Sequence, residues 1–194
     1  MMVGFDFDNT LVGYGDLFYT AALEAGLIPS GFSRSKTAIR DLMNETGMRD
    51  EWTALQGKVY GTMMDRAQLF PGVSECLQEL KKRDIPCCII SHKTRYAKKG
   101  PPYDLHRAAR DFLRRTGLPI PQDMIFFCPE RAEKIRLIRE LKCTCFVDDL
   151  PEVFAEPDFP PGVKKILFGA AVSGVPSVIA CPDWDQIGKE LLAR

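Results

Sequence analysis

Four carboxylates stand at two positions where an apolar run of the sequence ends. Asp6 and Asp8 follow the first apolar run, and the adjacent pair Asp148 and Asp149 follows a later one. The carboxyl ends of parallel strands lie at one edge of a sheet, which would bring these side chains together. Four negative charges in one crevice are costly unless some are protonated or a cation lies among them. The spacing therefore predicts a site for a hard divalent cation.

The available donors favour Mg²⁺ at this site, with Mn²⁺ as an alternative. The chain has two histidines, His92 and His106, and no CxxC pair, so oxygen ligands dominate. Such a site leaves coordination positions for water and a substrate phosphate, as phosphoryl transfer requires. The seven cysteines are odd in number, and we expect them to be core residues rather than disulfide partners or zinc ligands.

A hydroxyl and an ammonium group are expected near the same edge. Ser91 ends another apolar run, and Lys134 lies on an amphipathic pattern that precedes Asp148. Lys134 does not stand clearly at the start of this helical pattern, so Arg131 and Lys142 are alternative sources of the positive charge. The sequence thus offers carboxylates, a hydroxyl and a cation to one site.

Six short apolar segments of β-favouring composition must position these groups. Helical patterns alternate with them, and Asp183 with Gln186 forms a capping-box arrangement for the last helix. Strands that alternate with helices favour a doubly wound, Rossmann-like parallel sheet of the α/β class. The expected strands are residues 3–8, 87–91, 125–128, 143–147, 165–168 and 177–180, and further helices are expected at 73–80, 105–113 and 132–141.

One long segment interrupts this alternation, because it contains three helical patterns and no strand pattern. We therefore expect a small helical cap at residues 15–70, inserted after the first strand. The α/β core would then comprise residues 1–14 and 71–194. The three patterns cover residues 17–25, 39–43 and 52–63, with Ser33 and Asp50 as expected N-caps of the second and third.

The run Asp6-Phe7-Asp8-Asn9-Thr10-Leu11 matches a DxDxT signature and resembles the haloacid dehalogenase-like superfamily. The other three motifs of that superfamily follow in the same order, and its members insert a helical cap at the place of residues 15–70. The resemblance implies an aspartyl-phosphate intermediate on Asp6, with Asp8 as general acid and then base. It also implies that Ser91 donates to the phosphoryl oxygens, that Lys134 clamps nucleophile and phosphate, and that Mg²⁺ is held by Asp6, the backbone carbonyl of Asp8, Asp148 and Asp149.

The presence of Asp8 distinguishes between activities of this superfamily. Dehalogenating and phosphonate-cleaving members resemble the pattern but lack the second aspartate. A phosphate ester needs it to protonate the leaving alkoxide, and general acid–base catalysis contributes about 10²- to 10⁴-fold. We therefore expect a Mg²⁺-dependent phosphatase of a small phosphate monoester.

Three alternatives stay open at this point. A phosphomutase would use the same intermediate. A phosphatase of nucleotides or nucleic-acid ends would use the same site, and the short spacing between Lys134 and Asp148 is similar to that of the deoxyribonucleotidase branch. A non-catalytic binding domain could share the fold.

The segment 92–115 carries eight basic side chains against two acidic ones. Because it begins at the expected strand end, its basic residues could face the site and hold a second anionic group of the substrate. A solvated basic surface is the alternative. The expected substrate contacts from the first motif and this loop are Asn9, Thr10, His92, Lys93 and Arg95.

The chain has no net charge, with 26 basic and 26 acidic residues, so no global field favours nucleic acid or a membrane surface. Its apolar runs are far shorter than the roughly 20 residues of a membrane span. Acidic residues close to the first position do not fit a secretory signal. We expect a cytoplasmic protein whose partner is a small phosphorylated metabolite, a sugar phosphate or a nucleotide, with no membrane or nucleic-acid partner.

Overall fold

The computed structural model describes residues 1–169 and 175–193 and contains two compact units. Residues 170–174 and 194, which belong to the expected core, lie outside the described residues. The first unit comprises Met1–Gly13, Leu69–Lys93 and Gly117–Arg194, and the second comprises Tyr14–Gln68 and Thr94–Thr116.

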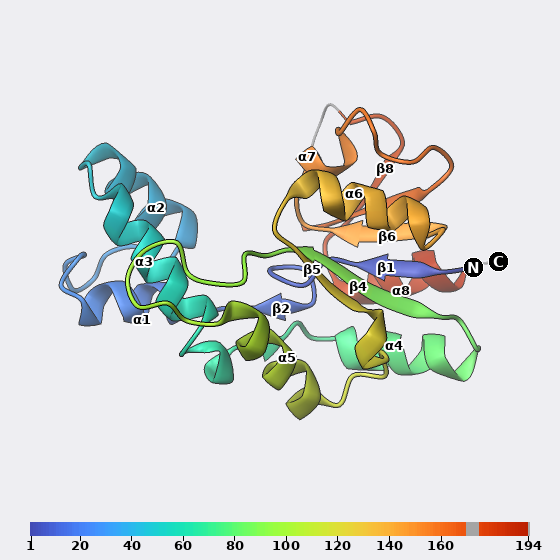
Figure 1. Cartoon of the computed structure of the whole chain (residues 1–194), viewed down its shortest axis with the longest axis horizontal. Coiled ribbons are helices and arrows are strands. Elements are labelled where there is room, and N and C mark those ends of the chain that lie inside the picture. The colour runs from blue at the N-terminus through green and yellow to red at the C-terminus, as the bar shows by residue number, and fades with distance from the viewer. Residues whose placement is uncertain (170–174, 194) are drawn as a thin grey trace. The chain divides into compact units, whose positions relative to one another are not determined.

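A six-stranded sheet forms the centre of the first unit (Figure 1). Its strand order is β5-β4-β1-β6-β7-β8, and every neighbouring pair is parallel. The prediction of a doubly wound α/β fold is confirmed. The strands are β1 (Val3–Phe5), β4 (Cys87–His92), β5 (Ile125–Cys128), β6 (Cys145–Asp148), β7 (Lys164–Phe168) and β8 (Val178–Cys181).

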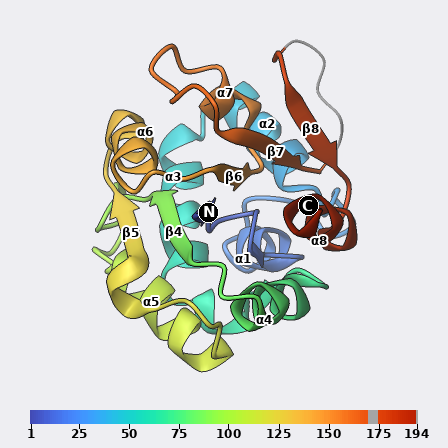
Figure 2. The ribbon, with the colours of Figure 1, turned by 90° about the vertical axis from the view of Figure 1, so that its right-hand side faces the viewer.

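Helices cover both faces of this sheet, because its central strands are apolar on both sides (Figure 2). The helices α6 (Arg131–Glu140) and α7 (Pro151–Phe154) lie on one face, and α4 (Val73–Lys82) and α8 (Trp184–Leu192) lie on the other. A short 3₁₀ turn, η2 (Gln122–Met124), precedes β5. The central strands β1, β4 and β6 are thus enclosed, so polar side chains of a site are expected where these strands end.

The packing on each face follows from the alternation of side chains along the strands. Cys88 and Ile90 of β4 belong to the buried cluster beneath α6 and α7. On the opposite face, the Phe5 ring contacts the Trp184 ring with centroids 5.8 Å apart. All seven cysteines are buried and unbridged, as expected for core residues.

The second unit is helical, and its first three helices confirm the expected pattern. One predicted cap is wrong: Ser35 Oγ, not that of Ser33, accepts a hydrogen bond from the backbone of α2. Asp50 does not cap α3 but lies in its first turn, where a carboxylate complements the positive helix end. The helices are α1 (Leu17–Glu24), α2 (Lys36–Glu45), α3 (Arg49–Tyr60), the 3₁₀ turn η1 (Met64–Arg66) and α5 (Leu105–Thr116).

The division into units differs from the expected one at Thr94–Thr116, which belongs to the helical unit. Two glycines at the end of α3 explain this. A Cβ on Gly57 would lie 2.7 Å from the Ala97 side chain, and one on Gly61 would lie 2.7 Å from the Tyr103 side chain. Because glycine lets the backbone approach so closely, residues 97–103 pack directly on α3. A two-stranded ribbon, β2 (Val12–Gly13) with β3 (Gln68–Leu69), lies where the chain leaves the first unit and returns.

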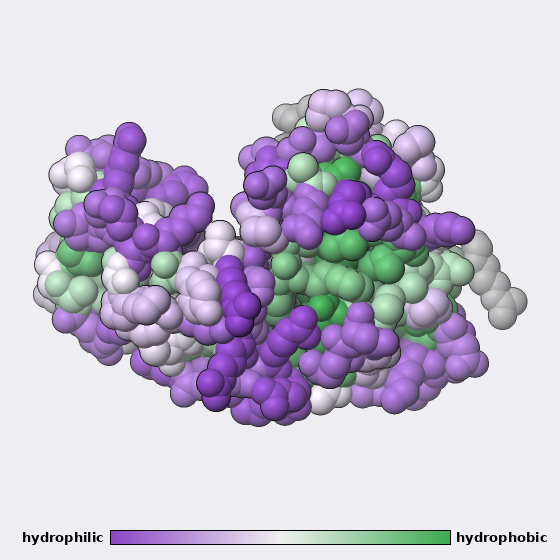
Figure 3. Space-filling model, in the orientation of Figure 1, coloured by the Kyte–Doolittle hydropathy of each residue, from purple (hydrophilic) through white to green (hydrophobic). Residues whose placement is uncertain are grey.

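The surface of the first unit is hydrophilic over α4 and α6, with an apolar band over the edge strand β5 (Figure 3). Phe126 and Phe127 of this strand are half-buried. In the described part of the chain, no helix has the length and apolar character of a membrane span.

Candidate active site

The register of the sheet brings three strand ends to one edge of the first unit. Phe5 of β1 lies opposite Ile89 of β4 and Val147 of β6. The next residue, Asp6, donates its backbone N–H to the Val147 carbonyl at 2.9 Å. Asp6 therefore stands at the level of Asp148, although the two are far apart in the sequence.

Lys134 provides the positive charge between these two carboxylates. Its Nζ lies 2.6 Å from Oδ1 of Asp6 and 2.6 Å from Oδ2 of Asp148, and all three side chains are buried. Lys134 occupies the first turn of α6, so the helix that covers this face aims the ammonium group at the strand ends. Arg131 pairs with Glu156 instead. Of the proposed cations, Lys134 is therefore the one that contacts the nucleophile candidate.

Burial and crowding of negative charge change the ionisation of these groups. Burial, reinforced by the carboxylates of Asp148 and Asp149, raises the pKa of Asp6 to about 8, although the ammonium of Lys134 opposes this rise. Burial and the Asp148 carboxylate raise the pKa of Asp149 to about 6. Burial lowers the pKa of Lys134, but the adjacent Asp6 and Asp148 carboxylates outweigh it and hold that pKa above the ordinary lysine value. The site as a whole has more negative charge than one lysine neutralises.

This excess charge fits a divalent cation. One carboxylate oxygen from each of Asp6, Asp148 and Asp149 lies within 4.8 Å of the others, in the described part of the chain. An all-oxygen donor set suits Mg²⁺ or Mn²⁺, and a bound cation would favour the ionised carboxylates of Asp6 and Asp149 against the burial that raises their pKa. The side chain of Asp8 does not belong to this group of three. Its expected role through the backbone carbonyl stays a prediction.

A tight turn after β1 fixes the rest of the first motif. The backbone N–H groups of Leu11 and Val12 both donate to the Phe7 carbonyl, at 3.1 Å each. Asn9 has φ +60°, a left-handed conformation that asparagine tolerates better than most residues. The buried Thr10 hydroxyl donates to Oδ1 of Asp149 at 3.2 Å. The turn thus ties the first motif to the last one.

Asp8 contacts a different lysine, Lys93, which follows β4 directly. Lys93 Nζ lies 2.6 Å from Oδ2 of Asp8. Lys93 is among the residues expected to contact substrate, and the structure buries it against this carboxylate. The sequence did not single out this pair, because Lys93 is one of eight basic residues in the segment 92–115. Its position two residues after Ser91, on the same side of an extended chain, is the signal that could have indicated it.

The other residues expected to contact the substrate do not share the environment of Lys93. Ser91 is buried at the end of β4. His92 is exposed, and its Nε2 lies 3.1 Å from the Pro129 carbonyl oxygen. Arg95 belongs to the second unit, where its guanidinium lies 3.6 Å from the Asp104 carboxylate. Substrate contacts by these residues stay predictions.

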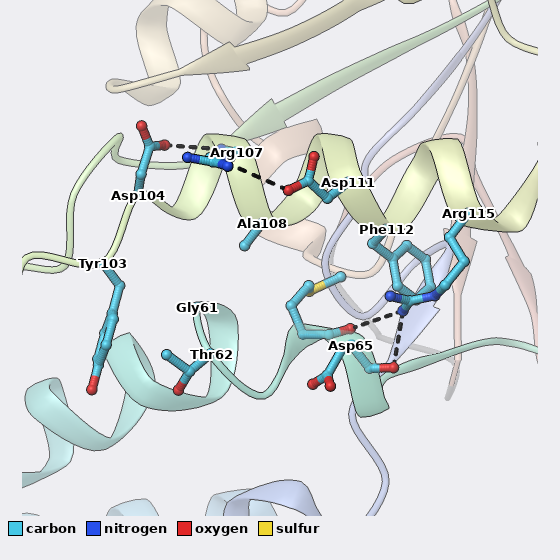
Figure 4. Close-up of a pocket in the computed structure, with 11 residues that line it drawn as sticks. Gly61, Thr62, Asp65, Tyr103, Asp104, Arg107, Ala108, Asp111, Phe112 and Arg115 are labelled. Atoms are coloured by element: carbon cyan, nitrogen blue, oxygen red, sulfur yellow. Dashed lines mark hydrogen bonds and ion pairs between the residues drawn. The ribbon is translucent and has the colours of Figure 1, made fainter.

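The other basic residues of 92–115 form contacts within the second unit. Arg107 lies 3.8 Å from the Asp111 carboxylate, and Arg115 donates to the Asp65 carbonyl at 2.9 Å. Both arginines line a cavity of about 380 Å³ beside α5 (Figure 4). At least six of the eight basic residues have a partner within the chain: Lys93, Arg95, Lys99, Arg107, Arg114 and Arg115. The segment is therefore not simply an unpaired basic surface.

One further residue supports the site, and no pattern in the sequence had indicated it. Trp184, at the start of α8, is buried, and its Nε1 donates to the backbone carbonyl of Thr10 at 3.1 Å. Buried indole N–H groups usually find such a partner. Trp184 therefore restrains the turn that contains Thr10.

Solved structures of other proteins share the fold that positions this site. The sequence matches no protein-family model and no curated protein. A haloacid dehalogenase-like hydrolase from Streptococcus pneumoniae is similar in structure, with 21% identity, a TM-score of 0.61 and coverage of 99% of this chain and 96% of that chain. A proposed phosphatase from Clostridium difficile shares 15% identity, with a TM-score of 0.68 and 98% of both chains covered.

A third solved structure agrees with these two. A predicted phosphoglycolate phosphatase from Haemophilus somnus shares 17% identity, with a TM-score of 0.59 and coverage of 98% of this chain and 97% of that chain. The match extends over nearly the whole length of each protein. The expected fold is thus confirmed: the chain shares the fold of solved haloacid dehalogenase-like hydrolases.

Proposed function

We propose that this chain is a Mg²⁺-dependent phosphatase that hydrolyses a small phosphate monoester through an aspartyl-phosphate on Asp6. One observation carries the proposal: the Asp6 carboxylate is held 2.6 Å from the Lys134 ammonium, within a cluster that includes Asp148 and Asp149. A nucleophilic carboxylate beside a fixed cation and a metal site suits phosphoryl transfer, where positioning and charge neutralisation are the main tasks.

Asp6, Asp148 and Asp149 would hold the cation. When bound, Mg²⁺, or Mn²⁺ in its place, supplies positive charge for the phosphoryl oxygens. Lys134 supplies a fixed charge from the protein itself and restrains the Asp6 carboxylate. Its second contact, to Asp148, keeps the ammonium in place while Asp6 reacts.

In the first step, a carboxylate oxygen of Asp6 attacks phosphorus and forms the new P–O bond. The bond from phosphorus to the leaving oxygen breaks, and its electron pair remains on that oxygen. The carboxylic acid form of Asp8 donates a proton to it, so the leaving group departs as an alcohol. The Ser91 hydroxyl donates a hydrogen bond to a phosphoryl oxygen.

In the second step, a water molecule attacks the phosphorus of the aspartyl-phosphate. Asp8, now a carboxylate, accepts a proton from that water. The bond between Asp6 and phosphorus breaks, which releases inorganic phosphate and restores both aspartates. The proton that Asp8 lost in the first step is thus regained in the second.

The expected partner is a small phosphorylated metabolite, a sugar phosphate or a nucleotide. Names of two similar structures, a proposed phosphatase and a predicted phosphoglycolate phosphatase, support this class. The internal pairing of most basic residues in 92–115 gives no support to a nucleic-acid substrate. We expect the helical unit to select the substrate.

Phosphate release from a panel of sugar phosphates, nucleotides and an aryl phosphate tests the proposal. We expect turnover by the wild type with Mg²⁺, loss of turnover on chelation, and loss in Asp6→Asn. Asp158→Asn is the matched control, because it removes an exposed carboxylate of the same unit. It should retain wild-type activity.

Other outcomes would separate the alternatives. Release that persists in Asp6→Asn would contradict the assigned nucleophile. Transfer of the phosphoryl group to a second hydroxyl of a sugar phosphate, without release, would indicate a mutase. Mg²⁺ binding without turnover of any compound would favour a binding domain.

A further inference from the structure

Lys93 is a second buried ammonium group of the first unit, and both ends of this residue are held. Its Nζ donates to Oδ2 of Asp8 at 2.6 Å and lies 5.6 Å from the centroid of the Phe7 ring. Its backbone N–H donates to the Cys128 carbonyl at 2.8 Å. The Lys93 side chain is 3% exposed, whereas that of Asp8 is 17% exposed. An anchored lysine thus holds a carboxylate that reaches the surface of the unit.

The two buried lysines divide the two aspartates of the first motif between them. Lys134 comes from α6 and contacts Asp6, whereas Lys93 follows β4 and contacts Asp8. The two cations reach the motif from different elements, so the pairs are separate structural features. Removal of Lys93 leaves the Lys134 contacts to Asp6 and Asp148 in place.

We propose that Lys93 is a positioning residue that fixes the Asp8 carboxyl group for proton transfer to the leaving oxygen. This inference rests on the proposed function. An aspartate side chain has two torsions, and a hydrogen bond from an anchored donor to one carboxylate oxygen restrains both. Proton transfer needs a distance of about 2.6–3.2 Å between the donor oxygen of Asp8 and the leaving oxygen. A carboxyl group that is free to rotate would hold this distance for only part of the time and would protonate the leaving oxygen poorly.

The effect of Lys93 should depend on how strongly the leaving group needs a proton. Asp8 supplies that proton while the bond from phosphorus to the leaving oxygen breaks. p-Nitrophenolate is weakly basic and leaves without a proton, whereas phenolate is more basic and benefits from one. The two phenyl esters are similar in size, so a difference between them reports on proton transfer rather than on binding.

The first experiment measures kcat and KM of full-length Lys93→Met with p-nitrophenyl phosphate and phenyl phosphate in the presence of Mg²⁺. We expect kcat/KM, which reports on the step in which the leaving group departs, to fall at least about tenfold more for phenyl phosphate than for p-nitrophenyl phosphate, with little change in KM. Lys164→Met is the matched control, since it removes a lysine paired with Glu190 at 2.7 Å on β7 of the same unit. It should affect both esters equally and weakly.

A double-mutant cycle shows whether Lys93 acts through Asp8. In the Asp8→Asn background, Lys93→Met should cause no further loss, because the carboxyl group that it positions is already gone. This double variant also lacks an unpaired charge at the pair, so we expect it to fold even where Lys93→Met alone is unstable. Comparison of Asp8→Asn with the double variant then suffices.

Three results would overturn the positioning role while the proposed function stands: equal losses of kcat/KM for the two esters, a loss confined to KM, or additive losses in the cycle. A loss confined to KM would instead make Lys93 a substrate contact. A wild type that hydrolyses neither these esters nor the wider panel contradicts the proposed function, and the positioning role with it.

Discussion

The Nζ atom of Lys134 lies 2.6 Å from Oδ1 of Asp6, across 128 residues of sequence. The two residues come from the first turn of α6 and from the end of β1, so their contact depends on the packing of that helix on the sheet. Lys134 is only 1% exposed. A lysine so deeply buried is stabilised by its carboxylate partners, and it stabilises them in turn.

Lys134→Met should reduce both stability and activity. It leaves the buried Asp6 and Asp148 carboxylates without their cation, which we expect to lower the free energy of unfolding by about 3 kcal/mol. The value of kcat should fall at least about 100-fold, because a fixed charge at the reacting group is lost. Urea unfolding and phosphate release measure the two effects. Lys142→Met is the control, and an equal loss there would contradict the assignment of Lys134.

Mg²⁺ should raise the melting temperature, because it neutralises the excess charge of the three-carboxylate cluster. At a Mg²⁺ concentration of about 100 times the dissociation constant, the free energy of unfolding should rise by about 2.7 kcal/mol. This corresponds to a melting temperature roughly 5–10 °C higher for a chain of this size. Asp149→Asn should lose most of this shift, and Asp158→Asn should keep it. Thermal unfolding at constant ionic strength measures the shift. The same shift with NaCl alone would argue against a specific site.

Trp184→Phe should destabilise the turn of the first motif. It removes the indole N–H that donates to the Thr10 carbonyl, which leaves a buried acceptor unpaired at a cost of about 1–3 kcal/mol. Unfolding followed by circular dichroism measures this cost. Trp52→Phe, which changes a ring stacked on Phe18, is the comparison for loss of ring size alone. Wild-type stability of Trp184→Phe would show that the hydrogen bond contributes little.

Substitution of two helix glycines by alanine should change the free energy of unfolding in opposite directions. Gly57→Ala places a Cβ 2.7 Å from the Ala97 side chain, so we expect a loss of about 1–3 kcal/mol. At Gly188 of α8 the nearest atom is 3.8 Å away, an ordinary contact, and alanine should stabilise the helix by about 0.5–1 kcal/mol. Thermal unfolding of the two variants tests this difference. Two changes of the same sign would contradict it.

Alkylation of Cys76 and Cys87 should be slow and should accelerate with pH. Burial raises the pKa of Cys76 to about 11 and, with a contribution from Cys76, the pKa of Cys87 to about 12. A raised pKa means less thiolate at neutral pH, and the thiolate fraction grows about tenfold per pH unit below the pKa. Mass spectrometry after iodoacetamide treatment at pH 7 and pH 9 measures this change, with urea-unfolded protein as the fully labelled reference. Rapid native labelling at pH 7 would contradict it.

The sequence was sufficient for most elements of the first unit, because their signals are local. Apolar runs predicted all six strands of the sheet, and the capping box at Asp183 predicted the start of α8, where its side chain accepts from Gln186 N–H at 2.8 Å. The cap at Ser33 was wrong because two serines offered the same local signal, and backbone geometry selected Ser35.

The sequence also indicated which residue types stand at the strand ends, namely Asp6, Asp8, Ser91 and the Asp148–Asp149 pair, because parallel strands share one edge. Only the tertiary structure decided which cation serves which carboxylate. Helix rotation and side-chain reach decide which of Lys134, Arg131 and Lys142 contacts Asp6. The same quantities bring Lys93 to Asp8. Those quantities come from packing between distant segments, and one-dimensional spacing does not contain them.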